Sequence, residues 1–187
     1  MTDPAAAALL TMLLQANRLK TTPRTGWAMR GVPRPESVAD HSHGTALVAL
    51  VLLDLVKENL DRQRVLAMAV THDLAESVTG DLSLGASRLL PPGAKARAEA
   101  AALGELLSGL PFADRWGTWW DDLEAKQSPE ALLVRDADRL DLLIQALVYE
   151  RTTGNRELGE FWEFAPEDSF HYEASRAIRR LLAAERG

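Results

Sequence analysis

The stretch from Ser37 to Glu58, SVADHSHGTALVALVLLDLVKE, decides the fold of this chain. Its second half, Ala46–Leu55, is almost wholly apolar, which is typical of a helix that is buried on most sides. Ser37 with Asp40 three residues later resembles a capping box, although Asp replaces the usual Glu or Gln. The stretch therefore predicts a central helix that carries its polar residues near its amino-terminal end.

Helical spacing of apolar residues continues on both sides of this stretch. Before it, we expect an amphipathic core helix from Ala5 to Leu19, with Asp3 and Pro4 at its start, and then a loop over Thr21–Pro35 with three prolines and two glycines. After it, we predict helices over Asp61–Val78, Ala94–Leu107, Phe112–Gln127, Pro129–Arg151 and Glu167–Arg186. No alternation typical of a strand persists, so we predict an all-α, single-domain helical bundle over residues 1–187.

The ends of two predicted helices carry residues that favour those positions. Asp61 and Ser128 are suited to the amino-terminal caps of the helices that follow them, and Pro129 is suited to a first helical position. Gly80 is suited to the position just past a helix end. These residues support the predicted bounds of the helices over Asp61–Val78 and Pro129–Arg151.

The composition is that of an ordinary acidic globular chain. Of 187 residues, 47% are hydrophobic, and 21 basic against 27 acidic residues give a formal net charge of −6. Such a chain is a poor candidate for binding duplex nucleic acid, although it can bind a small anion locally. The lack of cysteine excludes disulfides and cysteine catalysis, so a metal must use His nitrogen and carboxylate oxygen. We recognise no targeting or membrane-spanning segment and expect a cytoplasmic protein with no membrane partner.

The pair His72-Asp73, with Glu76 four residues after the histidine, is the strongest chemical signal. Apolar residues surround the pair, so we expect it on a largely buried helix, where imidazole and carboxylate need partners. A hydrogen-bonded core pair would satisfy both groups. So would a divalent metal ion completed by ligands from other helices, which lowers the pKa of bound water and promotes attack on phosphorus. The pair therefore indicates a metal-dependent phosphohydrolase.

A further imidazole ligand is available upstream. His41 and His43 project about 200° apart on the apolar helix, so only one of them can face a shared site. We favour His41, because it aligns with Thr45 and Val48 along the helix. His171, late in the chain, is expected at the surface or in packing.

A further carboxylate ligand is available downstream, in the segment Leu133–Asp141. Spacing alone does not choose between Asp136, Asp138 and Asp141. All three could also be solvated helix charges paired with the neighbouring arginines of the same segment.

The order of His41, His72-Asp73 and Asp138 resembles that of the HD-domain metal-dependent phosphohydrolases and, among them, the compact subgroup of 5′-deoxynucleotidases. The resembling segments are Arg24-Thr25-Gly26-Trp27, Val38-Ala39-Asp40-His41-Ser42, His72-Asp73-Leu74-Ala75-Glu76, Thr79-Gly80-Asp81 and Leu133–Asp141. The resemblance implies an all-helical fold with a metal ion held between central helices by His41, His72, Asp73 and Asp138. It also implies hydrolysis of (deoxy)nucleoside 5′-monophosphates, with deoxyribose preferred, by a homodimer.

The residue chemistry agrees with that expectation. Mixed nitrogen and oxygen ligation suits one Mn²⁺, Co²⁺, Fe²⁺, Ni²⁺ or Zn²⁺ ion better than Mg²⁺, which prefers oxygen ligands. Glu76, one helical turn past His72, is the candidate general acid or base, so Glu76 and the ligand Asp73 are the expected catalytic residues.

Substrate-binding residues are expected in the proline-rich loop and after Gly80. Arg24 is our choice for the phosphate, over Arg30 and Arg34 of the same loop, because a guanidinium grips two phosphate oxygens. The resemblance implies that Trp27 contacts the sugar or base, and that Asp81 accepts a hydrogen bond from the sugar 3′-hydroxyl.

Other phosphohydrolase activities remain alternatives, namely cleavage of an alarmone pyrophosphate or of a nucleoside triphosphate. Ser77 after Glu76 departs from the alarmone hydrolase pattern, and four histidines are few for the two- or three-metal cyclic-dinucleotide phosphodiesterases. A non-catalytic nucleotide-binding protein is a third alternative. It predicts loss of a ligand or of Glu76, and all of these residues are present.

Overall fold

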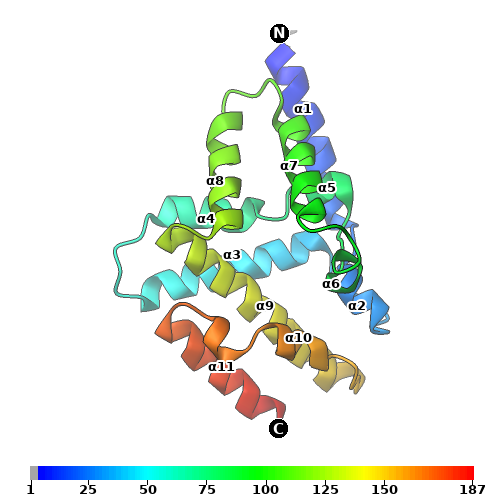
Figure 1. Ribbon diagram of the computed structural model, residues 1–187, viewed down its shortest axis with the longest axis vertical. Helices are drawn as coiled ribbons and strands as arrows, with labels where there is room; N and C mark the ends of the chain where they lie inside the picture. Colours follow the sequence, from blue (N-terminus) through cyan, green and yellow to red (C-terminus); the bar gives the residue numbers. More distant parts are fainter. Residues whose placement is uncertain (1–3) are drawn as a thin grey trace.

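The computed structural model describes residues 4–187, and this part of the chain folds into helices without a β-strand, which confirms the all-α prediction (Figure 1). The elements in chain order are α1 (Pro4–Ala16), η1 (Asn17–Lys20), α2 (Thr25–Met29), α3 (Val38–Leu55), α4 (Arg62–Thr71), α5 (Glu76–Thr79), α6 (Leu84–Ser87), α7 (Ala94–Leu107), α8 (Ala113–Ala125), α9 (Pro129–Thr153), α10 (Gly159–Phe164), η2 (Glu167–Ser169) and α11 (Glu173–Arg186), of which η1 and η2 are 3₁₀ helices. The predicted cap Asp3 lies outside the described residues.

The centre of the molecule is the crossing of α3 and α9, with α4 packed against both (Figure 1). Side chains from all three helices meet there with no exposed surface: Ala49, Leu52, Val65, Met68, Leu140 and Leu143. A second apolar cluster lies between α1, α7 and α8, which are the helices at the upper end of Figure 1. It includes Met12, Leu103 and Leu107. The metal ligands and catalytic residues predicted from the sequence lie where these two clusters meet.

Helix α3 begins as predicted. Ser37 accepts a hydrogen bond from the Asp40 backbone NH at 3.1 Å, and the Asp40 carboxylate accepts one from the Ser37 backbone NH at 2.9 Å, so the capping box is present. The expectation that α3 is buried on most sides is wrong, since Leu47, Val51 and Leu55 are about half exposed. By length and composition α3 could cross a membrane, but it packs against α4 and α9 as a core helix does.

The helix predicted over Asp61–Val78 is interrupted. Asp61 caps α4 as expected, but α4 ends at Thr71, and the next helix, α5, begins at Glu76. Between them the backbone turns through i→i+3 hydrogen bonds, such as the one from the Leu74 NH to the Thr71 carbonyl. Periodicity missed this break because the apolar residues continue across it. The predicted stop at Gly80 is confirmed, with a φ of 73° that favours glycine.

The proline-rich segment contains a short helix, α2, where a loop was expected. The Thr25 backbone NH donates to the Asp81 carboxylate, and the Thr25 hydroxyl donates to the Asp81 backbone carbonyl. Because Asp81 follows α5, these bonds fix the start of α2. Within α2, the Trp27 side chain is only 1% exposed. The helix is thus held by tertiary contacts that no local pattern could reveal.

The amino-terminal helix is less buried than predicted. Met12 is buried, but Leu9, Leu10, Leu13 and Leu14 of α1 are exposed. Near the carboxyl end, α9 begins with the predicted Ser128 cap, whereas α10 was not predicted. The final helix starts at Glu173 rather than Glu167, because the buried Asp136 carboxylate binds the backbone NH groups of His171 and Tyr172 and holds them extended.

Candidate metal centre

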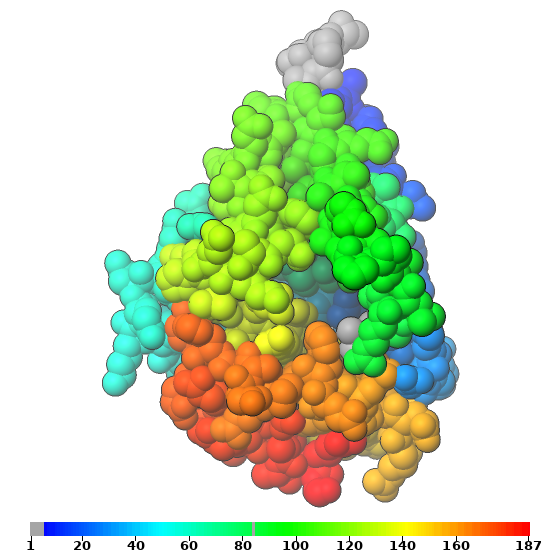
Figure 2. Space-filling view, viewed as in Figure 1, coloured from blue at the N-terminus to red at the C-terminus, as the bar shows by residue number. Residues whose placement is uncertain are grey.

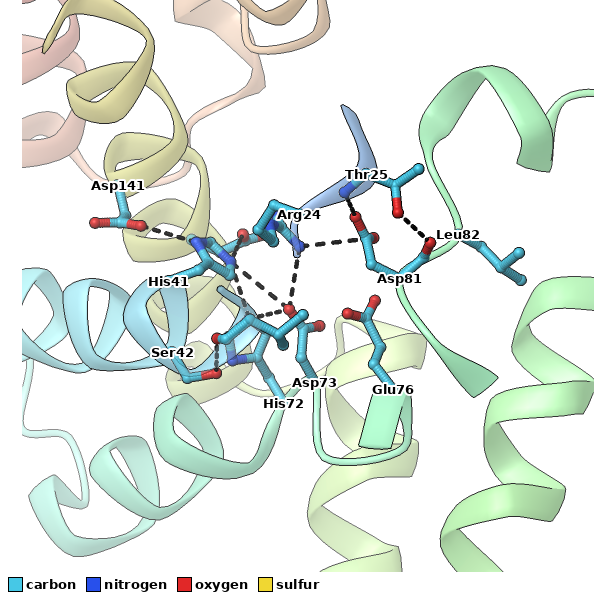
Figure 3. A network of polar contacts seen from close by, with 12 residues as sticks. Arg24, Thr25, His41, Ser42, His72, Asp73, Glu76, Asp81, Leu82 and Asp141 are labelled. Carbon is cyan, nitrogen blue, oxygen red and sulfur yellow. Dashed lines mark hydrogen bonds and ion pairs between the residues drawn. The ribbon is translucent and has the colours of Figure 1, made fainter. Parts of the chain in front are cut away.

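Four side chains from three parts of the chain converge at one point, and Figure 3 shows three of them, His41, His72 and Asp73. His41 lies in the first turn of α3, His72 and Asp73 follow α4, and Asp138 lies on α9. His41 Nε2 is 3.3 Å from His72 Nε2 and 3.1 Å from Asp138 Oδ1. Asp73 Oδ2 is 3.2 Å from His72 Nε2 and 3.7 Å from His41 Nε2. The structure thus brings together the four residues that the resemblance implied as ligands.

Hydrogen bonds at the far side of each imidazole set which nitrogen faces this point. His41 Nδ1 lies 2.8 Å from Asp141 Oδ2, and His72 Nδ1 lies 2.9 Å from the Ala69 carbonyl oxygen. Both partners are acceptors, so each Nδ1 carries a proton and donates it. In the neutral tautomer each Nε2 then presents a lone pair to the site, which is the arrangement of metal-binding histidines.

These donors fit a divalent transition-metal ion. Donor atoms about 2.1 Å from a shared ion, at angles of 90–110°, lie about 3.0–3.4 Å apart, and three of the four separations above fall in this range. Two Nε2 lone pairs 3.3 Å apart repel each other unless a proton or a metal cation lies between them. A set of two imidazoles and two carboxylates suits such ions better than it suits Mg²⁺.

Burial and the neighbouring charges shift the pKa values of the candidate ligands. Burial opposes protonation of His72, but the charge and hydrogen bond of Asp73, with the charge of Asp138, together outweigh burial and raise the His72 pKa to about 9. Burial disfavours the Asp138 carboxylate, but its hydrogen bond to His41 lowers the Asp138 pKa to about 2. The pKa of Asp73 also lies far below its usual value, because His72 and Arg24 outweigh burial. Both carboxylates are ionised at neutral pH, as metal ligation requires.

Two cavities open beside this centre, in the hollow that Figure 2 shows between the green segment that follows α5 and the yellow and orange segments of α9 and α10. One, of about 280 Å³, is lined by Arg24, Trp27, Glu76, Asp81 and other residues, including Phe161 and Phe164. The other, of about 390 Å³, is lined by residues of α7, α8 and α9, including Lys95, Trp120 and Arg135. Asp73 and Asp138 line both, so both cavities reach the centre.

The loop arginines lie in different environments. Arg24 Nη1 is 3.3 Å from Asp73 Oδ2 and 4.0 Å from Asp81 Oδ1, and the two charges outweigh burial and raise its pKa further above its usual value. Arg30 pairs instead with Glu160, and Arg34 is exposed. Of the three candidates, the structure brings only Arg24 to the centre.

Glu76 is buried at the edge of the centre, with 2% of its surface exposed. Its Oε1 lies 3.8 Å from Lys95 Nζ, and its Oε2 has no hydrogen-bond partner among the residues described. Burial raises the Glu76 pKa to about 9, helped by the charges of Asp73 and Asp81. Glu76 is therefore a buried acid with a pKa above neutral, and it lines the smaller cavity.

The remaining sequence candidates lie elsewhere or play other parts. His43 and His171 are exposed. Asp136 is buried away from the centre, where it holds the backbone before α11. Sequence reasoning left Asp141 as one of three alternatives and missed Lys95 altogether. The i,i+3 spacing of Asp138 and Asp141 was a usable signal for two carboxylates on one face of α9.

Known proteins share the sequence pattern of this chain. A model of the HD domain family matches residues 16–171. The 5′-deoxynucleotidase HDDC2 of Bos taurus is 36% identical over 186 residues, which cover 98% of this chain and 88% of that protein. The protein of the same name from Danio rerio is 32% identical over 182 residues, which cover 95% of this chain and 88% of that protein.

Solved structures extend the likeness to three dimensions. A conserved hypothetical protein from Pyrococcus furiosus has a TM-score of 0.80 and 37% identity, covering 95% of this chain and 98% of that one. A predicted metal-dependent phosphohydrolase from Magnetospirillum magnetotacticum has the same fold, with a TM-score of 0.75 at 23% identity over 98% of this chain and 96% of that one. With the family match over most of the chain and relatives above 30% identity along nearly all of it, this chain belongs to the HD domain family.

Proposed function

We propose that this chain is a divalent-metal-dependent phosphomonoesterase that releases phosphate from deoxynucleoside 5′-monophosphates. The observation that carries the proposal is the convergence of two imidazole Nε2 atoms and two carboxylates beside a cavity that Arg24, Trp27 and Asp81 also line. The relatives named 5′-deoxynucleotidase, at 32–36% identity over nearly the whole chain, support the same reaction.

In this proposal His41, His72, Asp73 and Asp138 hold the metal. The bound ion would supply Lewis acidity, which polarises a phosphate oxygen and lowers the pKa of water. Arg24 lies within 3.3 Å of Asp73 and faces the smaller cavity, so its guanidinium can bind phosphate oxygens next to the ligands. The contact with Asp73 also holds Arg24 in place before substrate arrives.

Glu76 is the proposed proton carrier. Hydrolysis breaks the bond between phosphorus and the 5′-oxygen, adds the elements of water, and leaves a nucleoside hydroxyl and inorganic phosphate. The leaving 5′-oxygen must gain a proton, and Glu76 is a buried acid that lines the same cavity as Arg24. Its unpartnered Oε2 is free to make that contact. Lys95, 3.8 Å from Oε1, balances the negative charge that Glu76 acquires when it loses the proton.

The nucleoside is proposed to lie in the smaller cavity. Asp81 already accepts a hydrogen bond from the Thr25 backbone through Oδ2, which leaves Oδ1 to accept one from a sugar 3′-hydroxyl. Trp27 packs against Phe161, with ring centroids 4.1 Å apart, and both rings line the cavity. This aromatic wall, with Phe164, offers a surface for the sugar and base.

The metal is proposed to be one of Mn²⁺, Co²⁺, Fe²⁺, Ni²⁺ or Zn²⁺ rather than Mg²⁺, since two of four ligands are nitrogen. The test is phosphate release from a panel of deoxyribonucleoside and ribonucleoside 5′-monophosphates with each metal, with 3′-monophosphates as the matched control. We expect release from deoxyribonucleoside 5′-monophosphates that disappears in His72→Ala and Asp73→Ala protein.

The same panel separates the alternatives. Faster turnover of a nucleoside triphosphate or of an alarmone pyrophosphate would replace the proposed substrate but keep the metal chemistry. Nucleotide binding without turnover in any metal would make the chain a non-catalytic binding protein and would overturn the proposal.

We also propose that the protein is a cytoplasmic homodimer. The apolar residues that α3 leaves exposed, Leu47, Leu50, Val51 and Leu55, support a partner surface on this helix. Light scattering after gel filtration should give twice the monomer mass of 20.5 kDa, and Val51→Lys should lower it to one monomer. Cell fractionation tests the location.

A further inference from the structure

The carboxylate of Asp141 contacts a proposed metal ligand but is not itself one of the four proposed ligands. Asp141 lies on α9, three residues after Asp138, and its Oδ2 is 2.8 Å from His41 Nδ1. His41 is therefore held between two carboxylates of the same helix, with Asp138 at Nε2 and Asp141 at Nδ1. The His41 side chain has no exposed surface, so Asp141 rather than solvent is the acceptor at its Nδ1.

The space that Asp141 occupies exists because α3 has a glycine there. A Cβ atom placed on Gly44 would lie 2.0 Å from Asp141 Oδ1, and the three nearest atoms it would meet all belong to this carboxylate. Gly44 lies inside α3, one turn after His41, where a glycine weakens a helix by about 0.5–1 kcal/mol relative to alanine. The close approach of Asp141 is a reason for glycine at this costly position.

From these contacts we infer that Asp141 and Gly44 together form a positioning device for the metal ligand His41. The carboxylate accepts the Nδ1 proton, fixes the tautomer and the ring plane, and leaves Nε2 as the electron donor. Its negative charge also makes the ring a better donor. Because Gly44 has no side chain, the Asp141 carboxylate can lie against α3 and reach the ring. The inference rests on the proposed metal site.

The other buried aspartate of α9 provides a contrast. Asp136 is 2% exposed, but its carboxylate accepts from the backbone NH groups of His171 and Tyr172 rather than from an imidazole. Asp136 and Asp141 are thus two carboxylates of one helix with separate duties. A substitution at Asp136 disturbs the fold near α11 and leaves His41 untouched, which makes it the matched control.

The first test is calorimetric titration of the metal-free protein with Mn²⁺. We expect Asp141→Ala to weaken Mn²⁺ binding by about 10–100-fold, the usual effect of losing such a partner. Asp141→Asn should recover part of the loss, because its amide oxygen can still accept the Nδ1 proton. Asp136→Asn should lower the melting temperature yet keep Mn²⁺ affinity. Circular dichroism of each variant confirms that it is folded.

The second test is a double-mutant cycle. Gly44→Ala alone should weaken Mn²⁺ binding about as much as Asp141→Ala, because the new methyl group displaces the carboxylate. In Asp141→Ala protein the same change should add no further loss, since the clashing atoms are gone. Gly104→Ala is the control, because a Cβ at this helical glycine of α7 meets no atom within 4 Å.

The third test observes the ring itself. In Zn²⁺-loaded protein, nitrogen-15 NMR should show His41 protonated at Nδ1, with a proton protected from exchange, and Asp141→Ala should lose this protection. The inference is overturned if Asp141→Ala binds Mn²⁺ as wild type does, or if the Gly44→Ala loss persists in full in the double variant. A wild-type protein that binds none of the metals overturns the proposed site as well, so the two failures are distinguishable.

Discussion

The two imidazoles of the centre are each fixed by two contacts, one facing the site and one behind it. His72 is held from behind by the Ala69 carbonyl, and His41 by Asp141. Glu36 forms a further contact behind the site, since its Oε1 accepts a hydrogen bond from Trp27 Nε1 at 2.9 Å. Residue types were visible in the sequence, but the pairing of His41 with Asp141 joins positions 100 residues apart.

Glu76 is predicted to carry protons without holding the metal. We expect Glu76→Gln to keep Mn²⁺ affinity within a few-fold of wild type and to lower kcat by about 10²–10⁴-fold, the usual contribution of a general acid or base. Calorimetry and phosphate release measure the two quantities. Glu99→Gln is the control, because Glu99 also pairs with Lys95 but does not line the smaller cavity. Loss of Mn²⁺ binding in Glu76→Gln would mean that Glu76 is a ligand.

Arg24 is predicted to be the phosphate-binding arginine. Its replacement by Gln removes a charged hydrogen bond worth about 1.5–3 kcal/mol, so kcat/KM should fall by about 10–150-fold. Arg30→Gln should change kcat/KM little, because Arg30 pairs with Glu160 at a half-exposed position. Equal losses in both variants would contradict the assignment.

Among the elements, α3 matters most to the site, because its first turn carries His41. The capping box of Ser37 and Asp40 fixes where that turn begins. We expect Ser37→Ala to cost about 0.5–2 kcal/mol of stability, which lowers the melting temperature by several degrees. Thermal unfolding followed by circular dichroism measures the change. A melting temperature equal to that of wild type would show that tertiary contacts alone fix the start of α3.

The same cap has a pH signature. Hydrogen bonds from the Ser37 backbone and hydroxyl lower the Asp40 pKa below its ordinary value of 3.8. A lowered folded pKa means that the stabilisation is present above pH 3.8 and is lost as pH falls through the folded value. The difference in melting temperature between wild type and Asp40→Asn should therefore be full near neutral pH and should shrink below pH 3.8. A constant difference across that range would argue against the capping role.

At the scale of the molecule, the proposed metal ties together α3, the turn after α4, and α9. A ligand that binds only the folded state stabilises it, by about 2.7 kcal/mol at a hundredfold excess over its Kd. We expect Mn²⁺ to raise the melting temperature and a chelator to reverse the rise, while His72→Ala protein should show neither effect. An equal rise in His72→Ala protein would place the bound metal elsewhere.

Local patterns predicted the parts of the fold that local chemistry controls. The Ser37 and Ser128 caps, the Gly80 stop and the bounds of α7 all follow from side chains within a few residues. The break after Thr71 and the short helix α2 were missed. Helix α2 depends on hydrogen bonds with a distant residue, as between Thr25 and Asp81. The break after Thr71 was missed because the apolar residues continue across it.

Residue order alone was enough to indicate an all-α fold, an acidic chain without thiol chemistry, and a set of His and Asp residues suited to a metal. It could not choose between the three aspartates of α9, because a helix presents several faces and spacing does not say which face meets a partner. Packing of α9 against α3 made that choice, bringing Asp138 and Asp141 to opposite nitrogens of His41 and turning Asp136 toward the backbone before α11. The physical reason is that ligation needs atoms about 3 Å apart, and only the folded chain sets distances between residues a hundred positions apart.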